Sequence, residues 1–424
     1  MSSNVLRMPR LSDSMEEATI VAWLKQPGEA FLRGEPLVEV ETDKATVVYE
    51  AEADGLLAEI LVSEGGTATL GEPIARLGGA DDDVPPPAIE TAPQASEKTV
   101  QPMVTTIDFR TAVREALDEE LAADDRVVFF GEDVAIAGGV FAVTTGLYEK
   151  YGRERVFDTP ISELALAGAA FGAAISGLRP VIEIMFGDFL TLAMDSLVNQ
   201  STKYWYLTGE QVPVPLVIRS VVGAGGRFGA IHSQMPVSWF MGVPGLKIVG
   251  PATPGDAKGL LRSAIRDDNP VLFFEHKRLY GIVGDVEDDL VPIGVARVAR
   301  EGTDVTVVSA MNGVHEALKA AEILSADGIA AEVIDLRTLR PLDIPTILTS
   351  VAKTNRIVVI EEGPLTGGWA GEVMARVMEE GLGDLDDAWR IATADSPVPY
   401  SPPLEDSFLP SAERIASEIR ARTL

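Results

Sequence analysis

The chain has 424 residues and no cysteine, which excludes disulfides, thiolate metal sites and cysteine nucleophiles. At about 150 residues per domain, this length predicts roughly three domains. The formal net charge of −30 disfavours a nucleic-acid partner, because a phosphate backbone would repel it. No apolar run reaches the ~20 residues of a membrane span, and the N-terminus lacks the apolar core of a signal peptide. We therefore expect no membrane partner, and a cytoplasmic protein or a processed matrix protein.

An internal repeat occupies the N-terminal region, residues 1–79. The segment GEAFLRGEPLV at 28–38 aligns with GGTATLGEPIA at 65–75, which lies 37 residues later. Each copy predicts a glycine turn, a short strand, a Gly-Glu-Pro turn and a second strand. Because each unit is too small to fold alone, we expect the two to close on each other as a flattened, all-β barrel with a pseudo-twofold axis.

A lysine lies between two predicted strands of this barrel. The alternating segment 37–48 has Asp43-Lys44 at its centre, so we expect Lys44 at the tip of a hairpin. Geometry alone favours a solvated turn lysine, because turns favour polar residues.

A linker is predicted at residues 80–103. The segment is rich in proline, alanine and acidic residues. Such a composition cannot bury enough apolar surface to fold, and proline keeps it extended. We expect a tether between two folded bodies.

Helical and strand patterns alternate from residue 104 onward, which predicts α/β domains with a mainly parallel sheet. We place the first domain at 104–285 and the second at 286–424, with the acidic stretch 283–289 at the join. The predicted helices are 108–122, 164–176, 315–326, 344–351 and 369–380. The predicted strands are 126–130, 155–157, 180–185, 215–219, 304–310, 330–336 and 356–362.

Three segments of the first α/β domain follow strands, where ligands bind in open α/β sheets. They contain Glu132, Ser162-Glu163 and the glycine-rich stretch 223–232, which ends in His232. Each residue also has an ordinary structural interpretation: a turn acid for Glu132, a helix-dipole carboxylate for Glu163 and a packed loop histidine for His232. Ser162 is expected to cap the helix that follows. The glycine-rich stretch matches neither the dinucleotide nor the Walker pattern, and spacing does not establish that the three segments converge.

Family resemblance changes the interpretation of Lys44. Residues 5–79, with LSDSMEE and ETDKA, resemble lipoyl domains of 2-oxoacid dehydrogenase complexes, whereas biotin carriers of similar fold usually have Met-Lys-Met. The resemblance implies that Lys44 carries lipoate through an amide bond. A long arm on a tethered domain would raise its local concentration at neighbouring active sites.

Residues 104–424 resemble the β subunit of the thiamine-diphosphate-dependent E1 component of 2-oxoacid dehydrogenases. This resemblance implies two transketolase-like α/β domains, a pyrimidine-binding domain and a C-terminal domain. The motifs that carry it are GEDVA at 131–135, FDTPISE at 157–163, AGAAFGAA at 167–174, HSQ at 232–234, PGLK at 244–247, DAKGLLRSAIRDDNP at 256–270 and DLRTLRPLD at 335–343.

The same resemblance implies roles for individual residues. Glu163 hydrogen-bonds the pyrimidine ring nitrogen and shares a proton with it, a role suited to a carboxyl whose pKa is raised by burial. Glu132 lines the same cleft, and Phe189 packs against the pyrimidine. His232 lies near the substrate and the incoming lipoyl group and transfers or stabilises protons. A structural K⁺ site, bound mainly by carbonyl oxygens, maps onto Leu216, Ala264, Ile265, Asp267 and Asn269.

A missing motif implies a partner. Related enzymes hold Mg²⁺ and the diphosphate with Gly-Asp-Gly followed by Asn, and this chain has no Gly-Asp-Gly. The resemblance therefore implies a separate E1 α subunit that supplies Mg²⁺, an α2β2 heterotetramer, and an E2 acyltransferase core as the next partner. The chain itself has neither the acyltransferase motif of E2 nor the cysteine pair of E3.

The substrate stays open between related reactions. We expect pyruvate dehydrogenase activity of the acetyl-transferring type. However, Leu192 stands where some pyruvate-type chains have a polar Gln near the cofactor. The segment EIMFGDF at 183–189 and the pair His276-Lys277 look closer to acetoin-type or broader 2-oxoacid β subunits. Acetoin dehydrogenase and branched-chain 2-oxoacid dehydrogenase are therefore the alternatives, and a non-catalytic lipoyl carrier or scaffold is a third.

Overall fold

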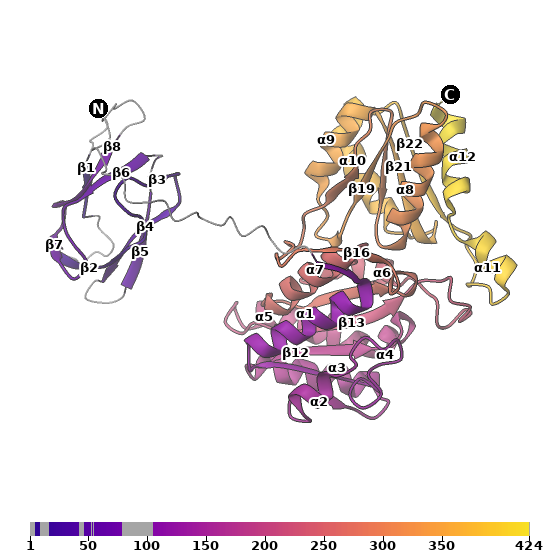
Figure 1. Cartoon of the computed structure of the whole chain (residues 1–424), viewed down its shortest axis with the longest axis horizontal. Helices are drawn as coiled ribbons and strands as arrows, with labels where there is room; N and C mark the ends of the chain where they lie inside the picture. Colours follow the sequence, from indigo (N-terminus) through magenta and orange to yellow (C-terminus); the bar gives the residue numbers. More distant parts are fainter. Residues whose placement is uncertain are drawn as a thin grey trace, which may run out of the picture. The chain divides into compact units, whose positions relative to one another are not determined.

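The computed structural model describes residues 5–8, 17–41, 46–51, 53, 55–78 and 105–423. The chain forms two compact units, Met1–Lys98 and Thr99–Leu424 (Figure 1). The predicted linker 80–103 lies outside the described residues. Within the described ranges, no helix combines the length and the apolar character that a membrane span requires.

The N-terminal unit consists of two four-stranded antiparallel sheets. Their strand orders are β1-β8-β6-β3 and β5-β4-β2-β7. The apolar faces of both sheets enclose one core, which includes Ile20, Trp23, Val38, Leu57 and Ile74. The strands are β1 (Val5–Arg7), β2 (Glu17–Trp23), β3 (Ala30–Phe31), β4 (Pro36–Glu41), β5 (Thr46–Glu50), β6 (Gly55–Ile60), β7 (Thr67–Thr69) and β8 (Pro73–Gly78).

The predicted 37-residue repeat is visible in the hydrogen bonds of this unit. Ile20 N donates to Gly66 O over 2.9 Å, and the equivalent pair is Leu57 N to Glu29 O over 3.0 Å. Each donor in one half therefore finds its acceptor in the other half, as a pseudo-twofold axis requires. Two glutamates repeat in the same way, with Leu32 N donating to Glu35 Oε2 (3.2 Å) and Thr69 N donating to Glu72 Oε2 (2.9 Å). The predicted flattened barrel is confirmed.

The lysine predicted to carry lipoate lies between two paired strands. β4 and β5 are antiparallel, with Glu41 opposite Thr46 and Val40 opposite Val47. Lys44 belongs to the connection 42–45, which lies outside the described residues. Its predicted position at a hairpin tip therefore stays a prediction.

The larger unit contains a seven-stranded sheet with the order β11-β10-β12-β13-β15-β14-β20. Six of these strands are parallel and β20 is antiparallel. The central strands are buried along their whole length, as expected for a sheet covered on both faces. The strands are β10 (Val127–Gly131), β11 (Val156–Asp158), β12 (Arg179–Ile184), β13 (Val217–Val222), β14 (Lys247–Val249), β15 (Val271–His276) and β20 (Thr338–Arg340).

Helices cover this sheet. α1 and α7 pack against each other through faces whose apolar residues recur at helical spacing. Asp108 caps α1 by accepting a hydrogen bond from Thr111 N, and Thr253 caps α7 in the same way through Asp256 N. The helices are α1 (Phe109–Ala123), α2 (Leu147–Tyr151), α3 (Glu163–Ile175), α4 (Leu190–Met194), α5 (Thr202–Leu207), α6 (Val237–Met241) and α7 (Pro254–Arg266), with a π-helical segment at Asp195–Ser201 and a 3₁₀ turn η1 at Gly187–Phe189.

A second sheet of five strands follows in the order β17-β19-β18-β21-β22, with β17 antiparallel. Helices α8 and α12 lie together on one side of it, and α9 and α10 lie together on the other (Figure 1). The elements are β17 (Arg297–Arg300), β18 (Val305–Ser309), α8 (Asn312–Ser325), β19 (Ala331–Asp335), α9 (Ile344–Thr354), β21 (Arg356–Pro364), α10 (Ala370–Gly381), β22 (Asp387–Thr393), α11 (Pro402–Phe408) and α12 (Ala412–Thr423).

The predicted α/β elements are present with ends shifted by a few residues, but several observed elements, including α7, β14, β15 and β22, were not predicted. Two details of the domain boundary also differ. The predicted join 283–289 is not all loop, because β16 (Val283–Val286) pairs with β9 (Thr105–Asp108). Strand β20 comes from the predicted second domain but extends the sheet of the first one, beside β14. A three-residue strand gives too short a pattern to be recognised without knowledge of its partner.

A buried arginine joins three adjacent strands of the larger sheet. Arg219 on β13 is 1% exposed and donates two hydrogen bonds to Glu275 on β15, of 2.7 and 2.9 Å. It donates a third, of 2.8 Å, to Glu183 on β12, and Tyr280 Oη donates to Glu275. Burial raises the pKa of Glu183, while burial of Arg219 is outweighed by the two glutamates, which raise its pKa. The guanidinium therefore stays charged and compensates both carboxylates.

Replacing this arginine with an uncharged side chain of similar length is expected to be strongly destabilising. Arg219→Met leaves Glu183 and Glu275 buried without their counter-charge, a defect that typically costs about 3–5 kcal/mol. Urea unfolding of the full chain measures the loss. Arg126→Met, which removes an exposed pair with Asp124, is the control and should change stability little. Equal, small effects of the two substitutions would contradict the role of Arg219.

Candidate active site

Two buried carboxylates meet beyond the carboxyl end of β10. Glu132 follows β10, and Glu163 is the first residue of α3; each is 7% exposed. Glu132 Oε1 accepts a hydrogen bond from the backbone N of Ser162 over 3.1 Å, which joins two of the three predicted segments. Burial, and then the negative charge of Glu163, raise the pKa of Glu132.

The carboxylate of Glu163 is available to a ligand. Among the described residues, none donates a hydrogen bond to it or pairs with it, although its side chain is buried. The predicted cap is wrong in one respect: Ser162 occupies the N-cap position, but its hydroxyl makes no capping bond. The carboxylate oxygens of Glu163 are not among the fully enclosed atoms that lack a partner, so they face accessible space in which a ligand can reach them.

An aromatic cluster surrounds the predicted histidine. The ring of His232 contacts Phe186 and Phe189 edge to face, with centroid separations of 4.7 and 5.3 Å. Phe189 ends η1, which follows β12, and His232 lies in the loop after β13. Since β10, β12 and β13 are parallel neighbours, both residues lie at the same edge of the sheet as Glu132 and Glu163. Within the described ranges, no hydrogen bond or ring contact joins the acidic pair to the aromatic cluster.

The glycine-rich loop is held from the second α/β domain. Glu362 in β21 accepts a hydrogen bond from Ala224 N and binds His276 Nε2 over 2.8 Å. Glu405 in α11 is fully buried and accepts from Gly225 N over 2.8 Å and from the Arg227 guanidinium. Gly223 has φ +87°, and a Cβ there would lie 2.1 Å from His276 Nε2, so this position requires glycine. Sequence reasoning missed both acids, because nothing in their local pattern indicates a partner 138 or 180 residues away.

Behind this loop lies a cavity of about 530 Å³ between the two α/β domains. Its polar lining includes Ser233, Gln234 and Glu362, and its apolar lining includes Met235 and Trp239. Ser233 is 2% exposed and its hydroxyl has no partner among the described residues. Gln234 is fixed by Asp188, whose Oδ1 accepts its side-chain amide over 2.8 Å. Asp188 lies within the EIMFGDF segment, and Ser233 and Gln234 belong to the HSQ motif at 232–234.

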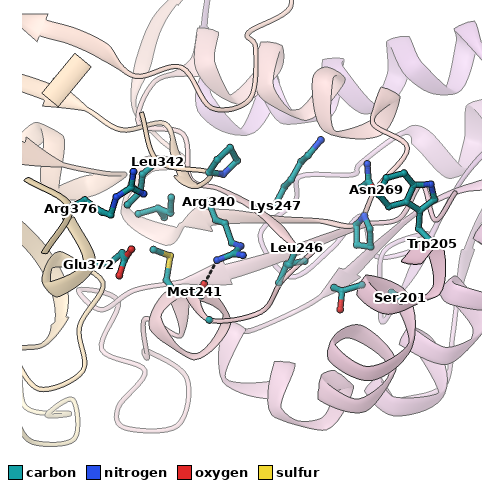
Figure 2. Close-up of a pocket in the computed structure, with 16 residues that line it drawn as sticks. Ser201, Trp205, Met241, Leu246, Lys247, Asn269, Arg340, Leu342, Glu372 and Arg376 are labelled. Carbon is teal, nitrogen blue, oxygen red and sulfur yellow. Dashed lines mark hydrogen bonds between the residues drawn. The ribbon is translucent and has the colours of Figure 1, made fainter. Parts of the chain in front are cut away.

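A larger cavity, of about 690 Å³, lies elsewhere, at the β14–β20 edge of the sheet (Figure 2). Arg340 lies in its centre and donates to Met241 O over 2.5 Å, while Glu372 and Arg376 reach it from α10. Neither the acidic pair nor the aromatic cluster lines it. Size alone therefore does not identify the site of chemistry in this chain.

The predicted potassium ligands lie near this second cavity, and Asn269 lines it. The five residues are gathered around the end of α7 and the start of β13. Donors of the chain already bind several of their oxygens: Arg179 donates to Ile265 O (3.0 Å) and Asp267 O (3.1 Å), and Lys247 pairs with the Asp267 carboxylate. The K⁺ site stays a prediction. The described residues contain no group of three or more His, Cys, Asp or Glu side chains that could hold a metal ion.

Comparison with known families divides the chain into three parts. Residues 4–77 match the biotin-requiring enzyme family, 105–283 match the transketolase pyrimidine-binding domain, and 294–415 match the transketolase C-terminal domain. A solved structure described as a split-gene transketolase, inactive beta4 tetramer, has a TM-score of 0.63 at 24% identity. It covers 74% of this chain and 97% of that one, which supports the fold.

Curated relatives extend the match to nearly the whole chain. The pyruvate dehydrogenase E1 component subunit beta of Rhizobium meliloti (strain 1021) is 40% identical over 98% of each chain. The acetoin:2,6-dichlorophenolindophenol oxidoreductase subunit beta of Cupriavidus necator is 44% identical over 75% of this chain and 98% of that one. The human mitochondrial pyruvate dehydrogenase E1 beta subunit is 42% identical over 78% and 92%. The chain therefore belongs to the family of E1 β subunits that contains these pyruvate dehydrogenase and acetoin oxidoreductase chains, and it has a lipoyl-type domain at its N-terminus.

Proposed function

We propose that this chain is the β subunit of a thiamine-diphosphate-dependent E1 enzyme that decarboxylates a 2-oxoacid and reductively acylates a lipoyl group. The observation that carries the proposal is the buried Glu163 carboxylate, which has no hydrogen-bond partner among the described residues. A carboxyl group in that setting suits a heterocyclic nitrogen, because a proton held between the two satisfies both. When bound, thiamine diphosphate supplies the carbanion that adds to the 2-oxo group.

Glu163 and Glu132 divide the acid–base work in this proposal. Glu163 holds a proton at the aminopyrimidine ring nitrogen and favours the imino tautomer of the pyrimidine. Glu132 already accepts a hydrogen bond from Ser162 N, and burial together with the charge of Glu163 raises the pKa of Glu132 itself. The two carboxylates therefore differ in their hydrogen bonding, since one is bound by the chain and the other has no partner among the described residues. Phe189 supplies an aromatic wall for the pyrimidine.

His232 is the proton donor for the later steps in this proposal. Its ring lies against Phe186 and Phe189, so the imidazole has a fixed plane while part of the residue stays accessible. An imidazole has one nitrogen that donates and one that accepts a proton, which suits proton transfer. We assign it to proton transfer when the acyl group passes to the lipoyl sulfur.

The enzyme requires a second polypeptide in this proposal. Exposed apolar side chains lie within four residues of the acidic pair in the sequence: Ile136 is 79% exposed, Ile161 82% and Leu164 56%. Such a patch beside a buried polar site favours coverage by a partner. We assign that coverage to an E1 α subunit, which brings Mg²⁺ and the diphosphate site in an α2β2 tetramer. An E2 acyltransferase core is the next partner, K⁺ occupies the predicted carbonyl site, and the complex works in the cytoplasm.

Pyruvate is the proposed substrate, because the relative that matches over nearly the whole chain is named for pyruvate dehydrogenase. Acetoin is the second candidate, since a named acetoin oxidoreductase subunit is 44% identical. Turnover of the purified αβ enzyme with pyruvate, branched-chain oxoacids and acetoin separates these alternatives. Turnover of acetoin alone would contradict the pyruvate assignment.

Glu163→Gln is expected to lower kcat by about 10²–10⁴-fold, because the amide cannot share a proton with the pyrimidine. Dye reduction by the αβ enzyme with pyruvate measures the loss. Glu154→Gln, which changes an acid whose side chain is 91% exposed, is the matched control and should retain full activity. Turnover that survives Glu163→Gln would favour the non-catalytic carrier hypothesis.

Lys44→Arg is expected to abolish lipoylation and to leave the first decarboxylation step largely intact, because the arm and the E1 site belong to different folded units. Intact mass after expression with lipoylating enzymes checks the first effect, and dye reduction checks the second. Lys25→Arg, in the same unit but paired with Glu29 and Glu35, serves as the control for lipoylation. A lipoylated Lys44→Arg chain would refute the assignment of the arm.

A further inference from the structure

A lysine lies behind the catalytic histidine without touching its ring. Lys277 follows β15 and begins the 3₁₀ turn Lys277–Leu279. Its Nζ donates a hydrogen bond of 2.5 Å to the backbone carbonyl of His232. The same ammonium lies over the rings of Phe228, at 4.9 Å, and Phe186, at 5.5 Å. One cation thus contacts both the loop that carries His232 and the aromatic wall against which that imidazole packs.

This cation is held without a carboxylate. No described Asp or Glu oxygen lies within ion-pair distance of Lys277 Nζ, although the fields of Asp188 on η1, Glu362 in β21 and Glu405 on α11 reach it. Those acids are engaged elsewhere, with Gln234, His276 and Arg227. Burial lowers the pKa of Lys277 to about 8, since these distant charges offset only part of the desolvation.

The second half of the glycine-rich loop 223–232, which ends in His232, is attached to the rest of the chain through Lys277. Its first half is bound at Ala224 N and Gly225 N by Glu362 and Glu405. Further along, the backbone bond from His232 N to Gly229 O is long, at 3.5 Å. Gly226 lies so close to the lysine that a Cβ there would be 3.1 Å from Lys277 Cδ. The strongest contact of the His232 backbone is therefore the one made by Lys277.

We propose that Lys277 is a positioning residue that fixes His232 for proton transfer by clamping its carbonyl and the aromatic wall together. The inference rests on the proposed function only in the reaction that it assigns to His232. All the contacts of Lys277 that form the clamp lie within this chain, so their effect on the loop can be measured without enzyme turnover. The contacts with the two aromatic rings require a charged ammonium, and the hydrogen bond to the His232 carbonyl weakens when the charge is lost. The clamp therefore loosens as pH rises through the range in which Lys277 loses its proton.

Lys277→Met, which keeps the length and removes the charge, is the informative variant. In the full chain without other subunits, hydrogen–deuterium exchange of the peptide 223–235 should become faster, while the melting temperature stays close to that of the wild type. In the αβ enzyme, kcat should fall by up to about 10²-fold, the usual cost of a displaced catalytic group, with the KM for the oxoacid little changed. Lys277→Arg should restore most of the rate.

The pH profile separates positioning from a general structural role. Wild-type kcat should decline on the alkaline side with a midpoint near the pKa of Lys277, about 8. Lys277→Arg should move that decline upward, because a guanidinium stays protonated. The control is Lys203→Met, which removes another lysine-to-carbonyl contact, to Pro244 O at 3.3 Å, and should alter neither exchange of the loop nor the profile.

Three results would overturn the inference. If hydrogen–deuterium exchange of residues 223–235 were unchanged in Lys277→Met, Lys277 would not hold the loop. A raised KM at constant kcat would mean that Lys277 contacts substrate instead of positioning His232. An alkaline decline that is identical in Lys277→Arg and wild type would assign the titration to another group. Absence of turnover in the wild-type αβ enzyme would count against the proposed function alone, since the exchange measurement would still decide the role of Lys277.

Discussion

A guanidinium buried between two carboxylates lies at the centre of the seven-stranded sheet, and the geometry of the site depends on it. Arg219 connects β12, β13 and β15 through Glu183 and Glu275, so these strands cannot slide past one another without separating buried charges. The loop with Phe189 follows the first strand, the loop with His232 follows the second, and Lys277 follows the third. The Arg219 cluster fixes the register of these three strands close to their carboxyl ends. It therefore also fixes the points at which the segments that contain Phe189, His232 and Lys277 leave the sheet.

A series of aromatic contacts connects the buried Arg219 cluster in the sheet with the loops that follow the strands. Tyr280, bonded to Glu275, stacks on Phe141 with a centroid separation of 5.3 Å. Phe141 contacts Phe186 and Phe228, the two rings that lie beneath the Lys277 ammonium. The buried ionic cluster and the imidazole are therefore ends of one continuous packed series. Mixed aromatic and cationic packing of this kind restricts motion without placing further hydrogen-bonding groups in the cleft.

Local patterns in the sequence were sufficient for the fold class, whereas the candidate site residues received their proposed roles from the family resemblance. A 37-residue repeat, alternating strands and helical spacing are short-range patterns, and they predicted the barrel and the α/β region. Glu132, Glu163 and His232 follow buried strands, so their place at one sheet edge was also accessible. Their convergence was not, because it depends on strand order. Glu362, Glu405 and strand β20 were also missed, because their partners are far away in the sequence. Glu362 and Glu405 bind the glycine-rich loop, and β20 pairs with β14.

The short strand β20 ties the two α/β domains together more closely than a linker would. Its backbone closes the β14 edge, and Gly250 N donates to Arg337 O beside it, over 2.9 Å. A fragment ending at the boundary suggested by composition would leave β14 with an unpaired row of amides and carbonyls, which invites intermolecular aggregation. We therefore expect that truncation or domain exchange in this family member has to keep residues 338–340 with the first sheet.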